Sequence, residues 1–139
     1  MTSGPHRRAV LLFERSQPSL GALVGAVAEI GLDVVGRCSE PEKLLALARE
    51  LRPDVVVMSL EASREDTALL RGVHASLADL DLVVVSRSDD EAAVEAALAA
   101  GASAYVVATP DGDDLATAIR LAFDQLPARA PVSDETRAR

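Results

Sequence analysis

Residues 81–107 read DLVVVSRSDDEAAVEAALAAGASAYVV, and this stretch decides the fold. It opens with a short valine-rich run, continues as an alanine-rich helical segment, and returns to a second short apolar run after Gly101. Short runs that are apolar throughout suit strands buried on both faces. Two such strands joined by one helix require a right-handed crossover and parallel pairing. The stretch therefore predicts a β-α-β unit.

The same alternation of strand and helix extends over most of the chain. Strands are predicted at Ala9–Phe13, Asp33–Arg37, Asp54–Met58, Asp81–Val85 and Tyr105–Val107. Helices are predicted over 18–30, 40–51, 64–78, 89–100 and 112–126. This order predicts an α/β domain, a doubly wound five-stranded parallel sheet of order 2-1-3-4-5 with helices on both faces.

The domain boundaries follow from the limits of this pattern. Residues 1–7 are expected to form an N-terminal tail, residues 8–126 the folded domain, and residues 127–139 a C-terminal tail or the start of a linker. The helix ends carry the residues expected of caps: Ser39 with Glu42, Ser88 with Glu91, Gly31 and Gly101.

Composition excludes several classes of function. The 139 residues carry 14 basic and 22 acidic side chains, a net charge of −8, so the basic surface that nucleic-acid binding requires is missing. No apolar stretch approaches the ~20 residues needed to cross a bilayer, so no membrane role is expected. The single cysteine, Cys38, allows no internal disulfide, which suits a reducing cytoplasm. We expect Cys38 to be a small packed hydrophobe and His74 to be a surface residue.

In doubly wound sheets, ligands bind at the carboxyl ends of the strands, where the strand order reverses. The segments PDVVVMSLEAS (53–63), VVVSRSDDEAAVEAALAAGASAYVV (83–107) and DDLATAIRLAF (113–123) resemble the response-regulator receiver domains, the CheY-like family. The last two are most similar to the receivers of NarL-type transcription regulators. The resemblance covers about residues 8–126 and implies a signalling function in transcriptional regulation.

At the positions that receivers use for phosphorylation, this sequence departs from the family. Where the resemblance implies an acidic pair it has Glu14 and Arg15, where it implies the phosphoacceptor aspartate it has Ser59, and where it implies a lysine it has Ala108. It keeps the hydroxyl position, Ser86, and the aromatic switch position, Tyr105. Phosphoryl transfer needs a carboxylate nucleophile and hard oxygen ligands for Mg²⁺, which this set does not supply. We therefore expect an atypical receiver with no catalytic residues, no metal, no cofactor and no phosphorylation.

Two alternatives remain open at this site. The acids Glu61, Asp89 and Asp90 could form a rearranged metal site in a working phosphoacceptor, although loop and helix-terminal carboxylates need no such role. A flavodoxin-like cofactor-binding protein is a further alternative, but ERSQPSLG is not a phosphate-binding loop. Arg15 with Glu14, or Arg87 with a neighbouring acid, could instead form an ion pair that fills the space of metal and phosphate.

The first helix suggests a contact surface. Its residues Leu20, Leu23, Val24, Val27 and Ile30 share one face. The opposite face and one residue of the last helix form a candidate interface with a second copy or another protein: Gly21, Ala22, Gly25, Ala26, Glu29 and Leu121. The resemblance implies a C-terminal helix-turn-helix domain, and DNA is expected to be bound only through such a domain. We do not expect it within these 139 residues, which are then either a fragment of a DNA-binding regulator or a free-standing receiver that acts on another protein.

Overall fold

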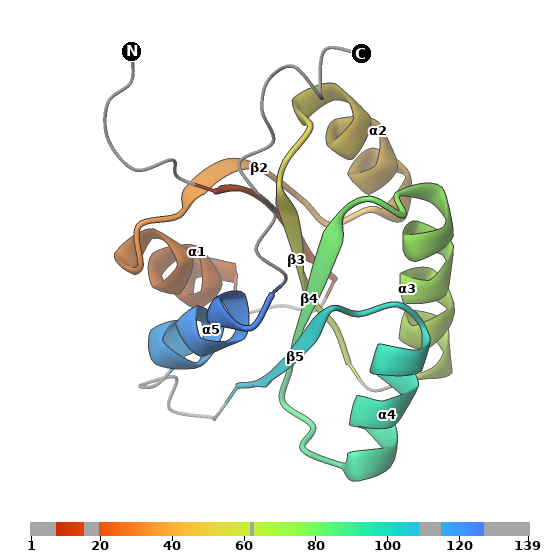
Figure 1. The fold of residues 1–139 in the computed structure, drawn as a ribbon. Coiled ribbons are helices and arrows are strands. Elements are labelled where there is room, and N and C mark those ends of the chain that lie inside the picture. The colour runs from red at the N-terminus through yellow and green to blue at the C-terminus, as the bar shows by residue number, and fades with distance from the viewer. Residues whose placement is uncertain (1–7, 16–19, 62, 109–114, 127–139) are drawn as a thin grey trace, which may run out of the picture.

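The computed structural model describes residues 8–15, 20–61, 63–108 and 115–126 of the chain (Figure 1). The predicted tails, residues 1–7 and 127–139, lie outside these residues. Strands and helices alternate five times, with these bounds: β1 Ala9–Glu14, α1 Leu20–Glu29, β2 Asp33–Cys38, α2 Pro41–Leu51, β3 Val55–Ser59, α3 Arg64–Ser76, β4 Asp81–Ser86, α4 Glu91–Ala99, β5 Ala104–Val107 and α5 Leu115–Asp124.

The five strands form one parallel sheet of order β2-β1-β3-β4-β5, which confirms the predicted fold class. Helices α1 and α5 cover one face of the sheet, and α2, α3 and α4 cover the other (Figure 1). Each predicted element is present. For the majority of helix and strand ends, the observed bound differs from the predicted one by one to three residues. The predicted start of α5, residues 112–114, lies outside the described residues.

Alternate residues of the central strands enter two separate cores. In β1, Val10 and Leu12 pack with α1 and α5, whereas Leu11 and Phe13 pack with α2 and α3. Successive side chains of a strand point to opposite faces, so a strand between two helical layers must be apolar at every position. This explains why the runs VVVM and LVVV read as continuous rather than alternating.

The glycine predictions at the helix ends are confirmed, because Gly31 and Gly101 follow α1 and α4 with φ angles of +84° and +121°. The two predicted capping boxes are wrong. Glu40, not Ser39, is the N-cap of α2 and makes no side-chain cap bond. Pro41 begins α2, and a proline fixes the preceding residue in an extended conformation that suits an N-cap.

Helix α4 begins after Asp90, not Ser88, and the Asp90 carboxylate accepts a hydrogen bond from the Ala92 N–H (3.4 Å). The Ser88 hydroxyl instead accepts from the Asp90 N–H (3.3 Å). Among α2, α3 and α4, the helices whose N-cap residue the structure describes, the serine cap is Ser63, whose hydroxyl accepts from the Asp66 N–H at the start of α3 (3.1 Å). The sequence pattern S-R-E-D around it was not interpreted as a cap.

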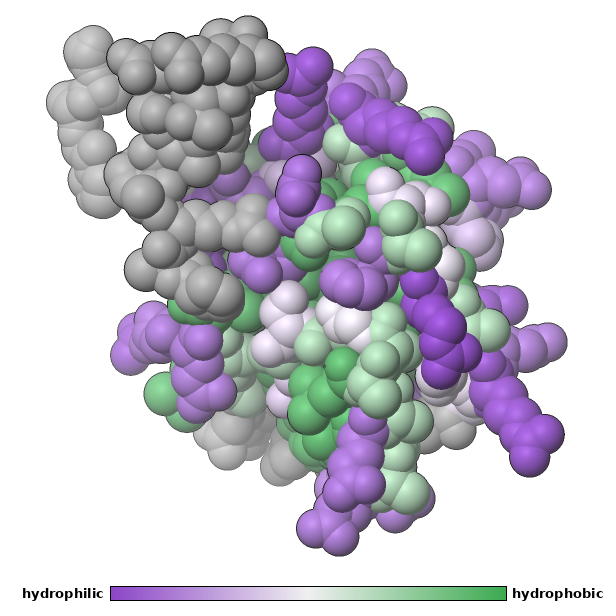
Figure 2. All heavy atoms as spheres, turned by 45° about the vertical axis from the view of Figure 1, so that its right-hand side comes forward, coloured by the Kyte–Doolittle hydropathy of each residue, from purple (hydrophilic) through white to green (hydrophobic). Residues whose placement is uncertain are grey.

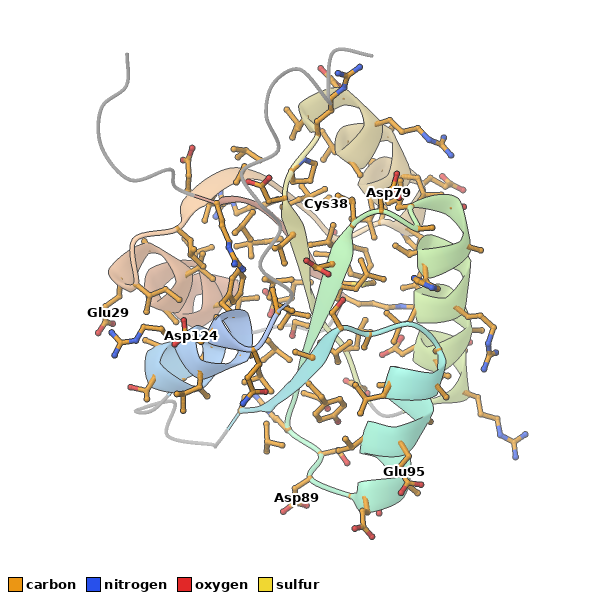
Figure 3. All side chains as sticks on the ribbon, in the orientation of Figure 1. Glu29, Cys38, Asp79, Asp89, Glu95 and Asp124 are labelled. Atoms are coloured by element: carbon orange, nitrogen blue, oxygen red, sulfur yellow. The ribbon has the colours of Figure 1, made fainter. Side chains whose placement is uncertain are left out.

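The surface over α2, α3 and α4 is mixed in character. Figure 2 shows hydrophilic side chains around the edge of this face and neutral to apolar side chains across its middle and lower part. Cys38 closes β2, is half-buried and packs against the core on this side, as expected (Figure 3). None of the described helices has the length and apolar character that a bilayer crossing requires.

Candidate functional site

The carboxyl ends of the strands bring the predicted pocket residues together. Glu14 pairs with Ser59 across β1 and β3, and the backbone N–H of Arg15 continues this pairing to the Ser59 carbonyl (3.4 Å). On the other side, the Ala108 N–H donates to the Ser86 carbonyl (2.7 Å) and extends the β4–β5 pairing. The five positions therefore line one edge of the sheet, as predicted.

Three of these side chains are buried at that edge. Glu14 is 1% exposed, Ser59 8% and Ser86 5%. Arg15 is more exposed, and by the alternation along β1 it lies on the side of Leu11 and Phe13, which faces α3. A cationic side chain on this side can reach the first turn of α3.

Arg15 forms an ion pair with Asp66 of α3. Its Nη1 atom donates to Asp66 Oδ1 at 2.9 Å, and its Nη2 lies 3.9 Å from Glu65 Oε1. The Asp66 side chain is 7% exposed and the Glu65 side chain 84%. The sequence suggested an ion pair at this edge, either between Arg15 and Glu14 or between Arg87 and a neighbouring acid. The acids that the structure places against Arg15 lie in α3 instead.

Asp66 is the residue of this site that sequence reasoning missed. It lies three residues after Ser63 and carries out two tasks, because its Oδ2 also accepts from the Glu61 N–H (2.6 Å). The sequence contains a signal for this second contact, because an acidic residue three positions after a serine N-cap commonly reaches back to the backbone before the helix. The pairing with Arg15, 51 positions away in sequence, carries no local signal.

The loop after β4 is held by Ser86 and Tyr105. The Ser86 hydroxyl accepts from the Ser88 N–H (3.1 Å), and the Tyr105 hydroxyl donates to the Ser88 carbonyl (2.9 Å). Tyr105 thus lies against the β4–α4 loop, at the side of a shallow surface hollow that Asp66 and Ser86 also line. Both positions retained from the receiver pattern are engaged with the same residue.

The acids of the alternative metal site do not converge. Asp90 caps α4, Glu61 is exposed, and Asp89 lies on the loop after β4 with its carboxylate directed away from the sheet (Figure 3). Within the described ranges, no three His, Cys, Asp or Glu side chains gather in a group that could hold a metal ion.

The structure shows which residues of the candidate interface on α1 and α5 lie at the surface. These two helices pack side by side (Figure 1), Gly25 and Glu29 are exposed, and Leu121 is 56% exposed. The assignment of Ala26 to the outer face is wrong, because Ala26 is 7% exposed and belongs to the core shared with α5. The buried face of α1 is wider than the leucine and valine stripe, since α1 packs on both the sheet and α5. The exposure of Gly21 and Ala22 lies outside what the structure describes.

Comparison with known proteins identifies the family. The chain is 37% identical over 101 residues to the response regulator GacA of Pseudomonas aeruginosa, covering 67% of this chain and 44% of that protein. It is 31% identical over 118 residues to the transcriptional regulatory protein PdtaR of Mycobacterium tuberculosis, covering 85% and 58%. No protein-family model matches the chain.

The fold has close structural neighbours. The signal receiver domain of NarL from Mycobacterium tuberculosis superimposes with a TM-score of 0.70 at 21% identity, covering 90% of this chain and 100% of that one. The chain therefore belongs to the receiver domains of the response-regulator, CheY-like family. It spans about half the length of the curated relatives it matches, 44% of GacA and 58% of PdtaR.

The family resemblance implies Mg²⁺ and a phosphoryl group at this edge, and the residues present do not fit them. Mg²⁺ requires several oxygen ligands in near-octahedral geometry. Here both oxygens of Asp66 are engaged, one with the Arg15 guanidinium and one with the Glu61 N–H. A guanidinium supplies no ligand and repels a dication, and the adjacent strand ends carry Ser59 and Ala108.

Proposed function

We propose that this domain is a phosphorylation-independent receiver, which carries out no reaction of its own and passes information by contact with another protein or a second copy of itself. The observation that supports this most directly is the ion pair of Arg15 with Asp66 at the strand ends, beside Ser59. Arg15 thus puts a cation of the chain at the position where the family resemblance implies a metal-ligating acid.

The chemistry of the remaining residues supports the same conclusion. A serine hydroxyl is a weak nucleophile unless a general base lies next to it. The side chain of Ala108 offers no positive charge to a phosphoryl group. A single such departure could be compensated, but loss of the nucleophile, of a metal ligand and of the counter-charge removes three independent requirements of phosphoryl transfer.

The setting of this function is proposed from the relatives. PdtaR is named a transcriptional regulatory protein and GacA a response regulator. We place the domain in cytoplasmic transcriptional control by analogy with them. Any DNA binding would belong to a further domain, since this chain is acidic and matches only about half of each relative.

The direct test is incubation with acetyl phosphate and Mg²⁺, followed by intact mass measurement. The wild-type chain is expected to gain no phosphoryl group. A matched variant, Arg15→Asp with Ser59→Asp and Ala108→Lys, restores the family pattern and serves as the comparison that can gain one. A phosphoryl adduct on the wild type would overturn the proposal, and its location at Glu61, Asp89 or Asp90 would favour a rearranged phosphoacceptor.

The contact surface that we favour is the exposed side of α1 and α5, with a second copy as the partner. A side chain added at Gly25 would enter open space, and Leu121 is exposed on α5, the helix that packs beside α1. Each glycine in a helix interior is unfavourable by ~0.5–1 kcal/mol relative to alanine, a loss that close packing of another helix would offset.

Sedimentation velocity across micromolar concentrations tests this surface. We expect a dimer for the wild type, a monomer for Gly25→Glu, and a dimer for Gly72→Glu, which places the same charge in open space on α3. A monomeric wild type would remove the second copy as partner without affecting the phosphorylation test.

A further inference from the structure

The carboxylate of Asp66 joins two elements that are distant in sequence. One oxygen accepts from the Arg15 guanidinium, just after β1, at 2.9 Å, and the other accepts from the Glu61 N–H, just after β3, at 2.6 Å. The Asp66 side chain is 7% exposed. A buried carboxylate held by two donors has little freedom to move without losing both bonds.

The described residues of the loop between β3 and α3 (60, 61 and 63) are hydrogen-bonded to one another and to the first turn of α3. The Asp66 N–H donates to the Ser63 hydroxyl (3.1 Å), the Ser63 N–H donates to the Glu61 carbonyl (2.8 Å), and the Thr67 hydroxyl donates to the Ser63 carbonyl (3.0 Å). The loop begins at Leu60, whose N–H donates to the Val85 carbonyl of β4 (3.0 Å). The loop and the first turn of α3 therefore form one bonded unit.

Arg15 is the side chain that connects this unit to β1. Hydrogen bonds between charged groups are shorter and roughly twice as strong as neutral ones, and they strengthen further when one partner is buried. The contact of Arg15 with Glu65 is different, because the atoms are 3.9 Å apart and the Glu65 side chain is 84% exposed, a situation in which ion pairs contribute little. The connection thus depends on Asp66.

We propose that Arg15 and Asp66 form a built-in tether, which fixes the β3–α3 loop and the start of α3 against β1 in the free protein. This inference rests on the proposed function and deepens it. The loop takes its position from a cation of the chain itself, with no bound ion and no covalent modification. A partner that contacts this loop or the first turn of α3 meets the same arrangement at all times.

Amide hydrogen exchange of the full chain, without Mg²⁺ or a phosphodonor, tests the tether. Loss of a hydrogen bond to a charged group is expected to speed exchange through local opening by about ten- to a hundredfold. We expect this acceleration in residues 60–61 and 63–67 of Arg15→Gln. Glu65→Gln, which removes a neighbouring charge from the same helix turn, is the matched control and should change these rates less than twofold.

A double-mutant comparison separates a direct pair from two independent effects. Asp66→Asn is expected to accelerate exchange of the same amides. The double variant, Arg15→Gln with Asp66→Asn, should exchange within about twofold of the faster single variant, because the second change removes a partner from a bond that is already lost. If Asp66→Asn does not fold, Arg15→Gln against Glu65→Gln decides the question alone.

The tether is overturned if loop exchange in Arg15→Gln stays within twofold of the wild type. This outcome is distinguishable from failure of the proposed function. A phosphoryl adduct on the wild type, with the exchange result as expected, would remove the proposed function and leave the tether in place.

Discussion

The ring of His74, in the last turns of α3, lies directly over Gly101, in the turn that ends α4. A Cβ atom built on Gly101 would lie 2.6 Å from the His74 Cβ and 2.7 Å from its Cδ2, closer than real side chains approach. Gly101 also has a φ of +121°, a conformation that other residues rarely adopt. This contact joins α3 to α4 at a point where only glycine fits, and it gives His74 a packing role on the surface.

We predict that Gly101→Ala destabilises the domain by about 2 kcal/mol, since the new methyl group meets His74 and the backbone is strained at this φ. For a domain of this size the melting temperature should fall by roughly 8 °C. Differential scanning calorimetry measures the change. Adding His74→Ala to this variant should recover part of the loss but not the backbone strain. An unchanged melting temperature would contradict both causes.

Gly72→Ala is the matched comparison and should have the opposite sign. Gly72 lies in the interior of α3, where an added Cβ meets nothing within 4 Å. Alanine is favoured over glycine in helices by ~0.5–1 kcal/mol, so the same measurement should show a higher melting temperature. A lower melting temperature would contradict the open space that the structure shows around Gly72.

The N-caps of α2 and α3 lead to a further prediction. Ser63→Ala should lose about 1 kcal/mol of unfolding free energy, because Ser63 accepts the Asp66 N–H at the start of α3. Ser39→Ala should change it by less than half of that, because Glu40 is the cap of α2. Urea denaturation compares the two. Equal losses would favour the capping box at Ser39 that the sequence suggested.

Cys38 provides a prediction on pH. Burial raises the pKa of the Cys38 thiol above its ordinary value, and Lys43 acts in the opposite direction. Less thiolate is then present near pH 8 in the folded chain, so iodoacetamide should react more slowly with it than with the urea-unfolded chain. Lys43→Gln should slow the reaction further. Equal rates in both states would contradict the raised pKa.

The same shift affects stability. Since the folded state favours the neutral thiol, Cys38 should lower the free energy of unfolding as the pH rises above the pKa of the unfolded thiol.

Tyr105→Phe tests the hold on the β4–α4 loop. The variant loses the hydrogen bond to the Ser88 carbonyl and should be less stable by about 0.5–1.5 kcal/mol, with faster amide exchange in residues 87–90. Ser88→Ala keeps that backbone carbonyl and should show a smaller change in stability. A loop that exchanges as in the wild type after Tyr105→Phe would mean that Ser86 alone holds it.

The fold could be predicted because strand and helix signals are local. Apolar valine runs buried on both faces identify β3 and β4, and glycines mark the ends of α1 and α4, without knowledge of neighbouring elements. The errors were also local in origin: Pro41 sets the start of α2 regardless of Ser39, and Asp90 is nearer than Ser88 to the start of α4. Ala26 was misplaced because periodicity within one helix does not show how many neighbours the helix packs against.

The site was predictable only in outline. Strand order places Glu14, Ser59, Ser86 and Ala108 at one edge, and the sheet confirms that placement. The partner of Arg15 was not predictable, because an ion pair depends on where two side chains end in space. Asp66, Glu65 and Glu61 all follow β3, and although the position of Asp66 after Ser63 indicates a contact with the preceding loop, the sequence does not show which of the three acids meets Arg15.

Among the described residues, β2 and β5 are paired on one side only. Edge strands invite another chain to add its backbone to the sheet. Here β5 has four residues, and β2 presents Asp33 and Arg37 to solvent, both of which discourage such addition. A partner of the proposed kind would therefore meet side chains of the helices and loops rather than a free strand edge, and single surface substitutions would alter that contact while the sheet stays unchanged.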